Sequence, residues 1–217
     1  MAIWTAFRGI YQLIPPDRNE PLMPDDGNET SNDLNAIYIN IRGAMDNFAW
    51  CLQYILGDAN SLNLLPAQIG LFNPVFLRQD AMRQIDKLLE PFKSWNKNFK
   101  ERRDPAAHRV PLSIIRQILD PASQSQFREI GQRVSQFEAN LYHAIGEKDY
   151  AESEKISADI DALRSEQQSL GKFRPFFEFD PAKSPIPLYP TLSSDVGKYV
   201  LISRKLIDFL KNTLKEP

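Results

Sequence analysis

The spacing of apolar residues along the chain predicts amphipathic helices separated by proline-rich connections. Residues 3–14 carry apolar side chains three or four positions apart, which is typical of a short helix with one buried face. The prolines and acids that follow, up to Ser31, indicate a surface loop. Asn32 or Asp33 can cap the next helix, and the apolar spacing then continues to Gly57, which predicts a long central helix.

The middle of the chain has a less regular pattern. Between residues 58 and 77, prolines and glycines interrupt the apolar spacing, and a strand near Gln68–Phe72 fits the short apolar run there. Helical spacing returns over residues 81–99. Pro91 is expected to kink or break that helix, because proline lacks the amide proton of a helix hydrogen bond.

Two shorter helices are expected after this region. Asp104 followed by Pro105 predicts a new helix start, with aspartate as the N-cap and proline at the first helical position. Another short helix is predicted over residues 112–119, where Pro121 would end it.

Residues 122–170 predict a helical hairpin. Two apolar seams, over residues 127–145 and 156–170, flank a short turn that contains Gly146. This hairpin is either an arm that reaches toward a second subunit or a pair of ordinary bundle helices, and the pattern does not choose between them.

The C-terminal part combines an extended segment with a final helix. Five prolines between residues 172 and 192 exclude a helix there, and Ser193 or Ser194 can cap the helix that follows. The expected fold class is therefore all-α, a helical bundle with a long antiparallel helical hairpin insertion and proline-rich connections. We divide this single domain, 1–217, into an N-terminal helix and linker (1–31), a bundle core (32–112), a hairpin region (113–170) and a C-terminal bundle helix (193–215).

Charge and composition exclude several classes of protein and several kinds of site. A net charge of −2 argues against a protein that coats DNA, which needs broad positive charge. The single cysteine, Cys51, excludes an internal disulfide and a multi-cysteine zinc site, and its apolar helical surroundings predict a small buried side chain. The N-terminus lacks the features of a secretory signal, and no apolar window approaches the length of a membrane span. We therefore expect a cytoplasmic protein with no membrane partner.

Positive charge is concentrated in one segment. Residues 92–109 hold six basic residues against Glu101 and Asp104, which gives a net charge of +4. The same segment contains His108, one of two histidines in the chain. The other, His143, lies beside Leu141 in the first helix of the predicted hairpin and is interpreted as an interfacial or partly exposed side chain.

Arg103 and His108 are the candidate catalytic residues. Histidine titrates near neutrality and can act as general acid or base, while arginine offers a planar fork that fits a phosphate. Asp104 is a candidate to orient either side chain. Phosphate loops, dinucleotide fingerprints, nucleophile elbows and paired-histidine metal motifs are all missing, so we expect no cofactor and no metal site. Candidate RNA contacts are the neighbouring bases Lys97, Lys100, Arg102 and Arg109.

The run from Arg103 to His108, RDPAAH, resembles the signature of the HEPN superfamily (higher eukaryotes and prokaryotes nucleotide-binding). The resemblance extends over residues 33–112 and includes the segment Ile39–Trp50, with the final helix completing the bundle. Arg102 offers a second register for the same motif, so the motif arginine is either Arg102 or Arg103.

The resemblance implies an all-α bundle that forms a homodimer, with two motifs meeting in one cleft. It implies a metal-independent endoribonuclease in which Arg103 contacts the scissile phosphate and His108 is the general acid or base. Members act in defence and toxin–antitoxin systems, so RNA is the implied substrate and an antitoxin protein a further partner. Other members have lost catalysis, and the alternative is a non-catalytic helical scaffold that binds RNA or protein.

Overall fold

A computed structural model describes residues 2–57, 64–108 and 111–214, with the backbone alone for residues 105–108. Helices form most of it, which confirms the predicted predominantly α-helical fold. The helices are α1 (Ala2–Leu13), α2 (Pro24–Leu56), α3 (Pro74–Leu77), α4 (Arg83–Leu89), α5 (Lys93–His108), α6 (Pro121–Gly146), α7 (Tyr150–Ser169) and α8 (Leu188–Thr213). The strands are β1 (Ser113–Ile114), β2 (Phe176–Glu178) and β3 (Ile186–Pro187). None of the helices in the described ranges is long and apolar enough to cross a membrane.

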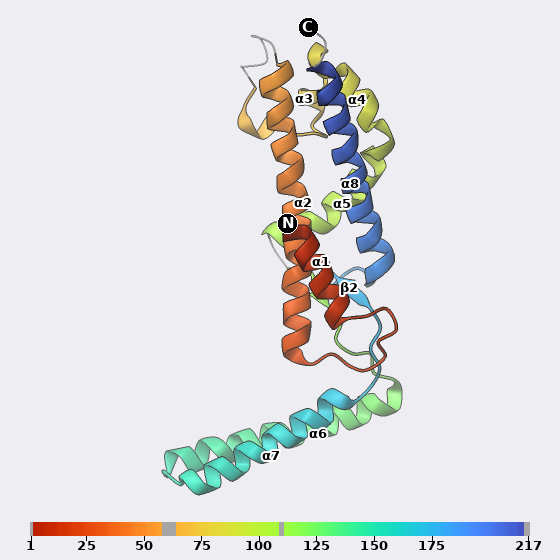
Figure 1. Ribbon diagram of the computed structural model, residues 1–217. Helices are drawn as coiled ribbons and strands as arrows, with labels where there is room; N and C mark the ends of the chain where they lie inside the picture. Colours follow the sequence, from red (N-terminus) through yellow and green to blue (C-terminus); the bar gives the residue numbers. More distant parts are fainter. Residues whose placement is uncertain (1, 58–63, 109–110, 215–217) are drawn as a thin grey trace.

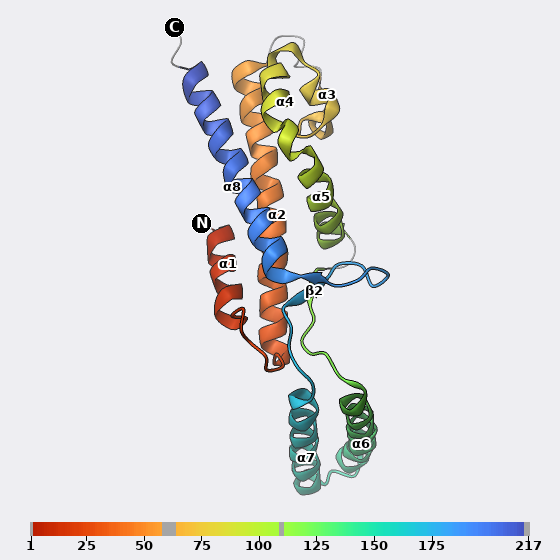
Figure 2. The ribbon, with the colours of Figure 1, turned by 90° about the vertical axis from the view of Figure 1, so that its right-hand side faces the viewer.

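Helix α2 is the axis of the body. Its 33 residues correspond to about 50 Å of helix. Helix α1 runs antiparallel to the first half of α2, and α3, α4, α5 and α8 surround the second half (Figures 1 and 2). Helix α5 descends from α4 toward the middle of α2, so the segment with the dense positive charge lies against the centre of the body.

One hydrophobic core joins these helices. Tyr38, Ile41 and Met45 contribute the α2 face of the core, and Phe99 of α5 and Phe177 of β2 pack into it. The apolar stripe predicted for the central helix is thus the buried face of α2. Cys51 lies outside that stripe and is exposed, which corrects the prediction that it is buried.

Two helices begin earlier than the sequence pattern predicted. Helix α2 begins at Pro24 rather than at Asn32 or Asp33, and α8 begins at Leu188 rather than after Ser193. Proline is tolerated in the first turn of a helix, because amides there have no helical acceptor. Pro24 and Pro190, which were interpreted as loop residues, therefore belong to helix starts.

Two short elements were also assigned wrongly. The strand expected near Gln68–Phe72 is replaced by a 3-10 turn at Pro66–Gln68 and a loop. The helix expected over 112–119 is instead strand β1 with an extended continuation. β1 pairs antiparallel with β2, which lies more than sixty residues further along the chain, and β2 pairs antiparallel with β3. Local periodicity cannot reveal a partner of β1 at that distance. The break expected at Pro91 is confirmed, since a 3-10 turn at Glu90–Phe92 separates α4 from α5.

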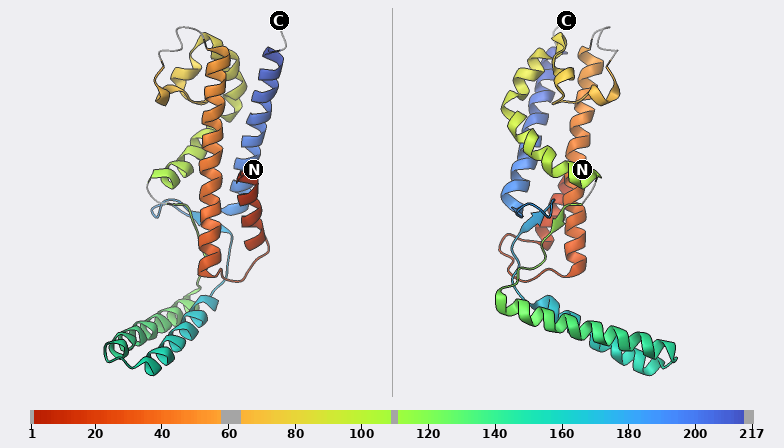
Figure 3. Two further views of the ribbon diagram at one scale, coloured as in Figure 1. Left: turned by 60° about the vertical axis from the view of Figure 1, so that its left-hand side comes forward. Right: turned by 180° about the vertical axis from the view of Figure 1, so that it is seen from behind.

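The α6–α7 hairpin projects from the lower end of the body (Figure 3). It has its own apolar core, in which Ile130 and Val134 of α6 pack with Ile156, Ile160 and Leu163 of α7. The two chain segments that lead to it are joined by backbone hydrogen bonds between Ile118 and Lys172, at 2.7 and 3.0 Å. The hairpin is thus an insertion mounted on a short antiparallel ribbon.

Candidate functional site

Helix α5 carries the candidate catalytic segment, and its two faces differ sharply. Phe99 is buried and stacks with Tyr38 of α2 at a centroid distance of 5.3 Å, while Trp95 packs beside Phe99 at 5.1 Å. Lys97 and Lys100 are exposed on the other side. The aromatic residues therefore fix the rotation of α5 and direct these two lysines to solvent.

Arg102 lies on the inner face, three residues after Phe99. Its Nη2 donates to both carboxylate oxygens of Asp195 in α8, at 2.8 and 2.9 Å, and its Nε donates to the hydroxyl of Tyr38 at 3.2 Å. The indole nitrogen of Trp95 donates to the same carboxylate at 2.8 Å. The side chain of Arg102 is 12% exposed and that of Asp195 is 2% exposed. Arg102 thus joins α2, α5 and α8.

Burial of this cluster shapes its electrostatics. Burial and the neighbouring charge of Asp195 raise the pKa of the Tyr38 hydroxyl, so the phenol stays protonated and donates to Asp195 at 2.6 Å. Burial opposes the charge of Arg102, but Tyr38 and Asp195 outweigh it and raise the pKa of the guanidinium. The predicted RNA contact at Arg102 is therefore a guanidinium committed to a buried ion pair.

Arg103, the next residue, has a different environment. Its Nη1 donates to the carboxylate of Asp104 at 3.1 Å, and these side chains are 24% and 40% exposed. Its Nε is buried and has no hydrogen-bond partner among the described residues. The guanidinium thus has one adjacent carboxylate, and its buried Nε makes no hydrogen bond with a described residue.

Asp104 is not the N-cap of a new helix, because α5 continues without a break to His108. The prediction of a helix start at Asp104 was wrong. Pro105 interrupts no more than one hydrogen bond, and the helix ends soon after it. His108 is the last residue of α5, and the structure describes its backbone but not its side chain. Arg109 lies outside the described residues altogether.

Helix geometry fixes the angles between the motif positions around the axis of α5. Five residues turn a helix by about 500°, so Arg103 and His108 occupy positions about 140° apart around the axis of α5. Asp104 and His108 are four residues apart, and their positions share one side of the helix. One copy of α5 therefore brings the positions of Asp104 and His108 together, and not those of Arg103 and His108.

The chain after α5 is tied back to α2. The side-chain amide of Asn35 accepts from the backbone nitrogen of Leu112 and donates to its carbonyl, both at 2.9 Å. The hydroxyl of Ser31 accepts from the backbone nitrogen of Ile114 at 3.0 Å. These bonds anchor the segment that follows the motif, as the Arg102 cluster anchors the segment before it.

Comparison with known proteins adds no relative. No family model, no curated protein and no solved structure matches this chain.

Sequence reasoning missed Asp195 and Tyr38. A signal for each was present, because each interrupts an apolar stripe with a polar group. Asp195 stands between Leu192 and Val196 on the buried face of α8, and Tyr38 follows Ile37 on α2. A charged residue at a core position requires a buried partner.

Groups of three or more potential metal-ligating side chains do not occur in the described part of the chain.

Proposed function

We propose that this protein binds RNA along α5 and cleaves it without a metal ion, using Arg103 and His108. The proposal is supported by the different environments of the two adjacent arginines, Arg102 and Arg103. Arg102 is committed to Asp195 and Tyr38, whereas Arg103 is 24% exposed and pairs with the neighbouring, 40% exposed Asp104. This supports Arg103 as the motif arginine and removes Arg102 from the RNA contacts.

The proposed reaction is an internal phosphoryl transfer. The ribose 2′-oxygen attacks the adjacent phosphorus, the bond to the 5′-oxygen breaks, and a 2′,3′-cyclic phosphate and a 5′-hydroxyl result. One proton leaves the 2′-hydroxyl and one reaches the departing 5′-oxygen. Histidine suits both transfers, since its pKa lies near neutrality. The fixed charge of arginine stabilises the extra negative charge on the phosphate in the transition state.

A homodimer supplies the geometry that one α5 helix lacks. The positions of Arg103 and His108 lie about 140° apart around one helix. In a two-fold dimer, Arg103 of one protomer and His108 of the other can face the same phosphate, because the symmetry presents each residue twice. The proposal therefore includes a dimer as the active form.

One observation favours a second candidate, a non-catalytic helical scaffold that binds RNA or protein. Arg103 already has a carboxylate partner in Asp104, at 3.1 Å. If that ion pair persists in the presence of RNA, Arg103 stabilises α5 and does not contact an RNA phosphate. The scaffold keeps the buried cluster around Arg102 and performs no chemistry.

The decisive experiment incubates the purified protein with total RNA and with a tRNA pool in the presence of a chelator. His108→Ala should abolish cleavage, and His143→Ala should leave it intact. His143 is the matched control because its side chain is 74% exposed on the distant α6–α7 hairpin. Helical content and oligomer size should be equal in all three proteins.

The outcomes separate the two candidates. Cleavage by wild type and His143→Ala, but not by His108→Ala, supports the ribonuclease. Equal cleavage by all three proteins indicates a contaminating nuclease and overturns the assignment of His108. Absence of cleavage at concentrations where the dimer forms favours the scaffold.

The cellular role extends this proposal. A ribonuclease of this kind suits a cytoplasmic defence or toxin–antitoxin component whose activity an antitoxin protein restrains. Induced expression should then arrest growth, and His108→Ala should relieve the arrest. Growth that is unaffected by a protein shown to cleave RNA in vitro would contradict the toxin role while leaving the cleavage in place.

A further inference from the structure

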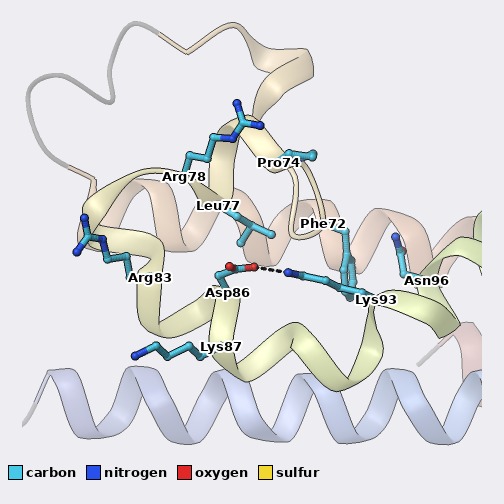
Figure 4. Close-up of a pocket in the computed structure, with 9 residues that line it drawn as sticks. All are labelled: Phe72, Pro74, Leu77, Arg78, Arg83, Asp86, Lys87, Lys93 and Asn96. Atoms are coloured by element: carbon cyan, nitrogen blue, oxygen red, sulfur yellow. Dashed lines mark ion pairs between the residues drawn. The ribbon is translucent and has the colours of Figure 1, made fainter.

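The surface pockets of the protein differ in how their cations are arranged. In the pocket between α3, α4 and the start of α5, Arg78 and Lys87 lie on opposite sides of the Asp86–Lys93 ion pair, so they do not face one ligand position (Figure 4). Another pocket, of about 590 Å³, lies on the ribbon that carries the hairpin. We call it the ribbon pocket, because its lining comes from both chains of the ribbon, within residues 115–120 and 172–176, together with Pro185.

Two cations of the ribbon pocket, Lys172 and Arg174, point in the same direction. Phe173, which lies between them in the sequence, is 1% exposed and packs in the core, whereas both neighbours are exposed. Successive side chains of an extended chain alternate between its two faces. Lys172 and Arg174 therefore share the outer face, with their Cα atoms about 7 Å apart, and both line the same pocket.

These cations are not neutralised by ion pairs. Lys172 and Arg174 have no ion-pair partner among the described residues. The acid in the pocket lining, Asp120, is the N-cap of α6 and accepts from the backbone nitrogen of Ser123 at 2.8 Å. That hydrogen bond, and to a smaller extent the charge of Lys172, lowers the pKa of Asp120. Asp120 is thus engaged by the helix, and two cations against one acid leave the lining net positive.

The facing chain of the ribbon supplies an apolar strip. Ile118, whose backbone pairs with that of Lys172, is 42% exposed, and Ile115 and Leu119 are half-buried beside it. An extended chain covers about 13 Å between Ile115 and Leu119. Phe176, whose carbonyl accepts from the backbone nitrogen of Ile115 at 3.0 Å, widens the strip at the end near the sheet. The ribbon pocket therefore places an elongated apolar strip beside two cations.

We propose that the ribbon pocket binds a linear aliphatic carboxylate, such as a medium-chain fatty acid. The carboxylate lies between Lys172 and Arg174, whose donors form charge-assisted hydrogen bonds with its oxygens. The alkyl chain lies along Ile115 and Ile118, because removal of its methylene groups from water stabilises the complex. The length of the strip suits an extended chain better than a flat ring. The pocket volume of about 590 Å³ lies within the range of small-molecule sites.

This site goes beyond the proposed cleavage of RNA, because its lining residues all lie outside α5. The ligand instead contacts Leu119, which precedes the N-cap of α6, and Phe176 of β2. It therefore bridges the base of the hairpin and the sheet of the body.

The test is a titration of the full chain, followed through the methyl signals of Ile115 and Ile118 in proton–carbon NMR spectra. The probes are octanoate, hexanoate, octanol and octylammonium. Lys172→Ala with Arg174→Ala removes both cations and leaves the backbone bonds of the ribbon in place. Arg128→Ala with Arg133→Ala removes the same charge from exposed positions of the hairpin and is the control.

Binding should depend on both charge and chain length. Octanoate should bind at least about tenfold more tightly than octanol, and octylammonium more weakly than octanol. Each buried methylene adds about fourfold in affinity, so hexanoate should bind up to about fifteenfold more weakly than octanoate. The variant without the two ribbon cations should lose the preference for octanoate over octanol, and the hairpin control should keep it.

Ile118→Thr tests the apolar strip separately. Threonine keeps the β-branched shape that suits an extended chain but shortens the apolar side chain. The Ile115 signal should then report weaker binding of octanoate and octanol alike, with the preference for octanoate retained.

Three results overturn the proposal: no saturable shift of the Ile115 and Ile118 signals with octanoate, equal affinities for octanoate and octanol, or equal losses in the ribbon and hairpin variants. The titration contains no RNA and does not depend on His108. Failure of the ribbon pocket and failure of the ribonuclease are thus distinguishable.

Discussion

Arg102 of α5 and Asp195 of α8 form a buried ion pair in which one guanidinium nitrogen bonds to both carboxylate oxygens, at 2.8 and 2.9 Å. Tyr38 of α2 and Trp95 of α5 donate to the same carboxylate. A single acid therefore satisfies donors from two other helices. This pair explains how the charged segment of α5 is held against the body while its other face stays exposed.

Removal of Asp195 should destabilise the protein strongly. Asp195→Ala leaves Arg102 charged and buried without its acid, an arrangement that costs about 3–5 kcal/mol. Chemical denaturation of the variant and wild type measures the difference in the free energy of unfolding. The effect should be smaller in the presence of Arg102→Ala than alone, because the two residues act as one unit.

Asp46 provides the control for this prediction. It bonds to Arg42 at 3.0 Å, but the two side chains are 37% and 29% exposed. Asp46→Ala should therefore cost less than about 1 kcal/mol. Similar losses for the two aspartate variants would show that the Asp195 cluster contributes no more than a surface pair.

Stability should decline at high pH through Tyr38. Burial raises the pKa of the folded Tyr38 hydroxyl above its ordinary value of about 10. Between these two pKa values the unfolded chain loses a proton that the folded protein keeps. The contribution of Tyr38 to stability is thus complete below about pH 10 and falls above it by up to about 1.4 kcal/mol per pH unit.

Tyr38→Phe isolates this contribution. The variant should be less stable at neutral pH by about 1–3 kcal/mol, because Asp195 and Arg102 lose a buried partner. Its stability should nevertheless decline less steeply between about pH 10 and 11. Tyr189, whose pKa burial raises to about 12, titrates in both proteins and does not affect the comparison. Equal alkaline slopes would contradict the role assigned to Tyr38.

Gly171 should be intolerant of substitution. It has a φ of +82°, and a Cβ there would lie 2.6 Å from the carbonyl oxygen of Ile118. Gly171→Ala should therefore weaken the ribbon below the hairpin by about 1–3 kcal/mol. Hydrogen exchange of the Ile118 and Lys172 amides, which bond across that ribbon, should accelerate in the variant.

Gly43 is the matching control. It lies inside α2, and a Cβ there would meet nothing within 4 Å. Gly43→Ala should stabilise the protein by up to about 1 kcal/mol, since alanine favours helix more than glycine does. If both alanine variants leave the ribbon amides equally protected, the close approach at Gly171 is not what shapes the ribbon.

The sequence predicted the helices best where the regular spacing of apolar residues was long and uninterrupted. The α6–α7 hairpin follows this rule, because its two seams contact each other and little else. The starts of α2 and α8 were placed too late, because a proline in a first turn has the same local signature as a proline in a loop.

For the candidate site, the sequence identified the segment but not the roles of its arginines. Trp95, Phe99 and Arg102 are four and three residues apart, so a continuous helix places all three on one face. That spacing could have indicated that Arg102 faces the core. Its partner Asp195 is 93 residues away along the chain, and no local pattern connects the two.

The exposed lysines of α5 make a quantitative prediction for RNA binding. Lys97 and Lys100 face solvent beside the motif, and the proposal assigns both to the RNA backbone. Each phosphate contact with single-stranded RNA adds about 0.7 to the slope of log affinity against log salt concentration. Lys97→Ala with Lys100→Ala should therefore reduce that slope by about 1.4 and weaken binding to all sequences alike.

Binding of an unstructured RNA to proteins that carry His108→Ala, measured by fluorescence anisotropy at several salt concentrations, provides the slope. Arg128→Ala with Arg133→Ala removes the same charge from the hairpin and should leave the slope unchanged. An equal reduction in both variants would mean that RNA responds to the net charge of the protein, and the path along α5 would be wrong. A change confined to the α5 variant would support that path even if the protein proves to be a non-catalytic scaffold.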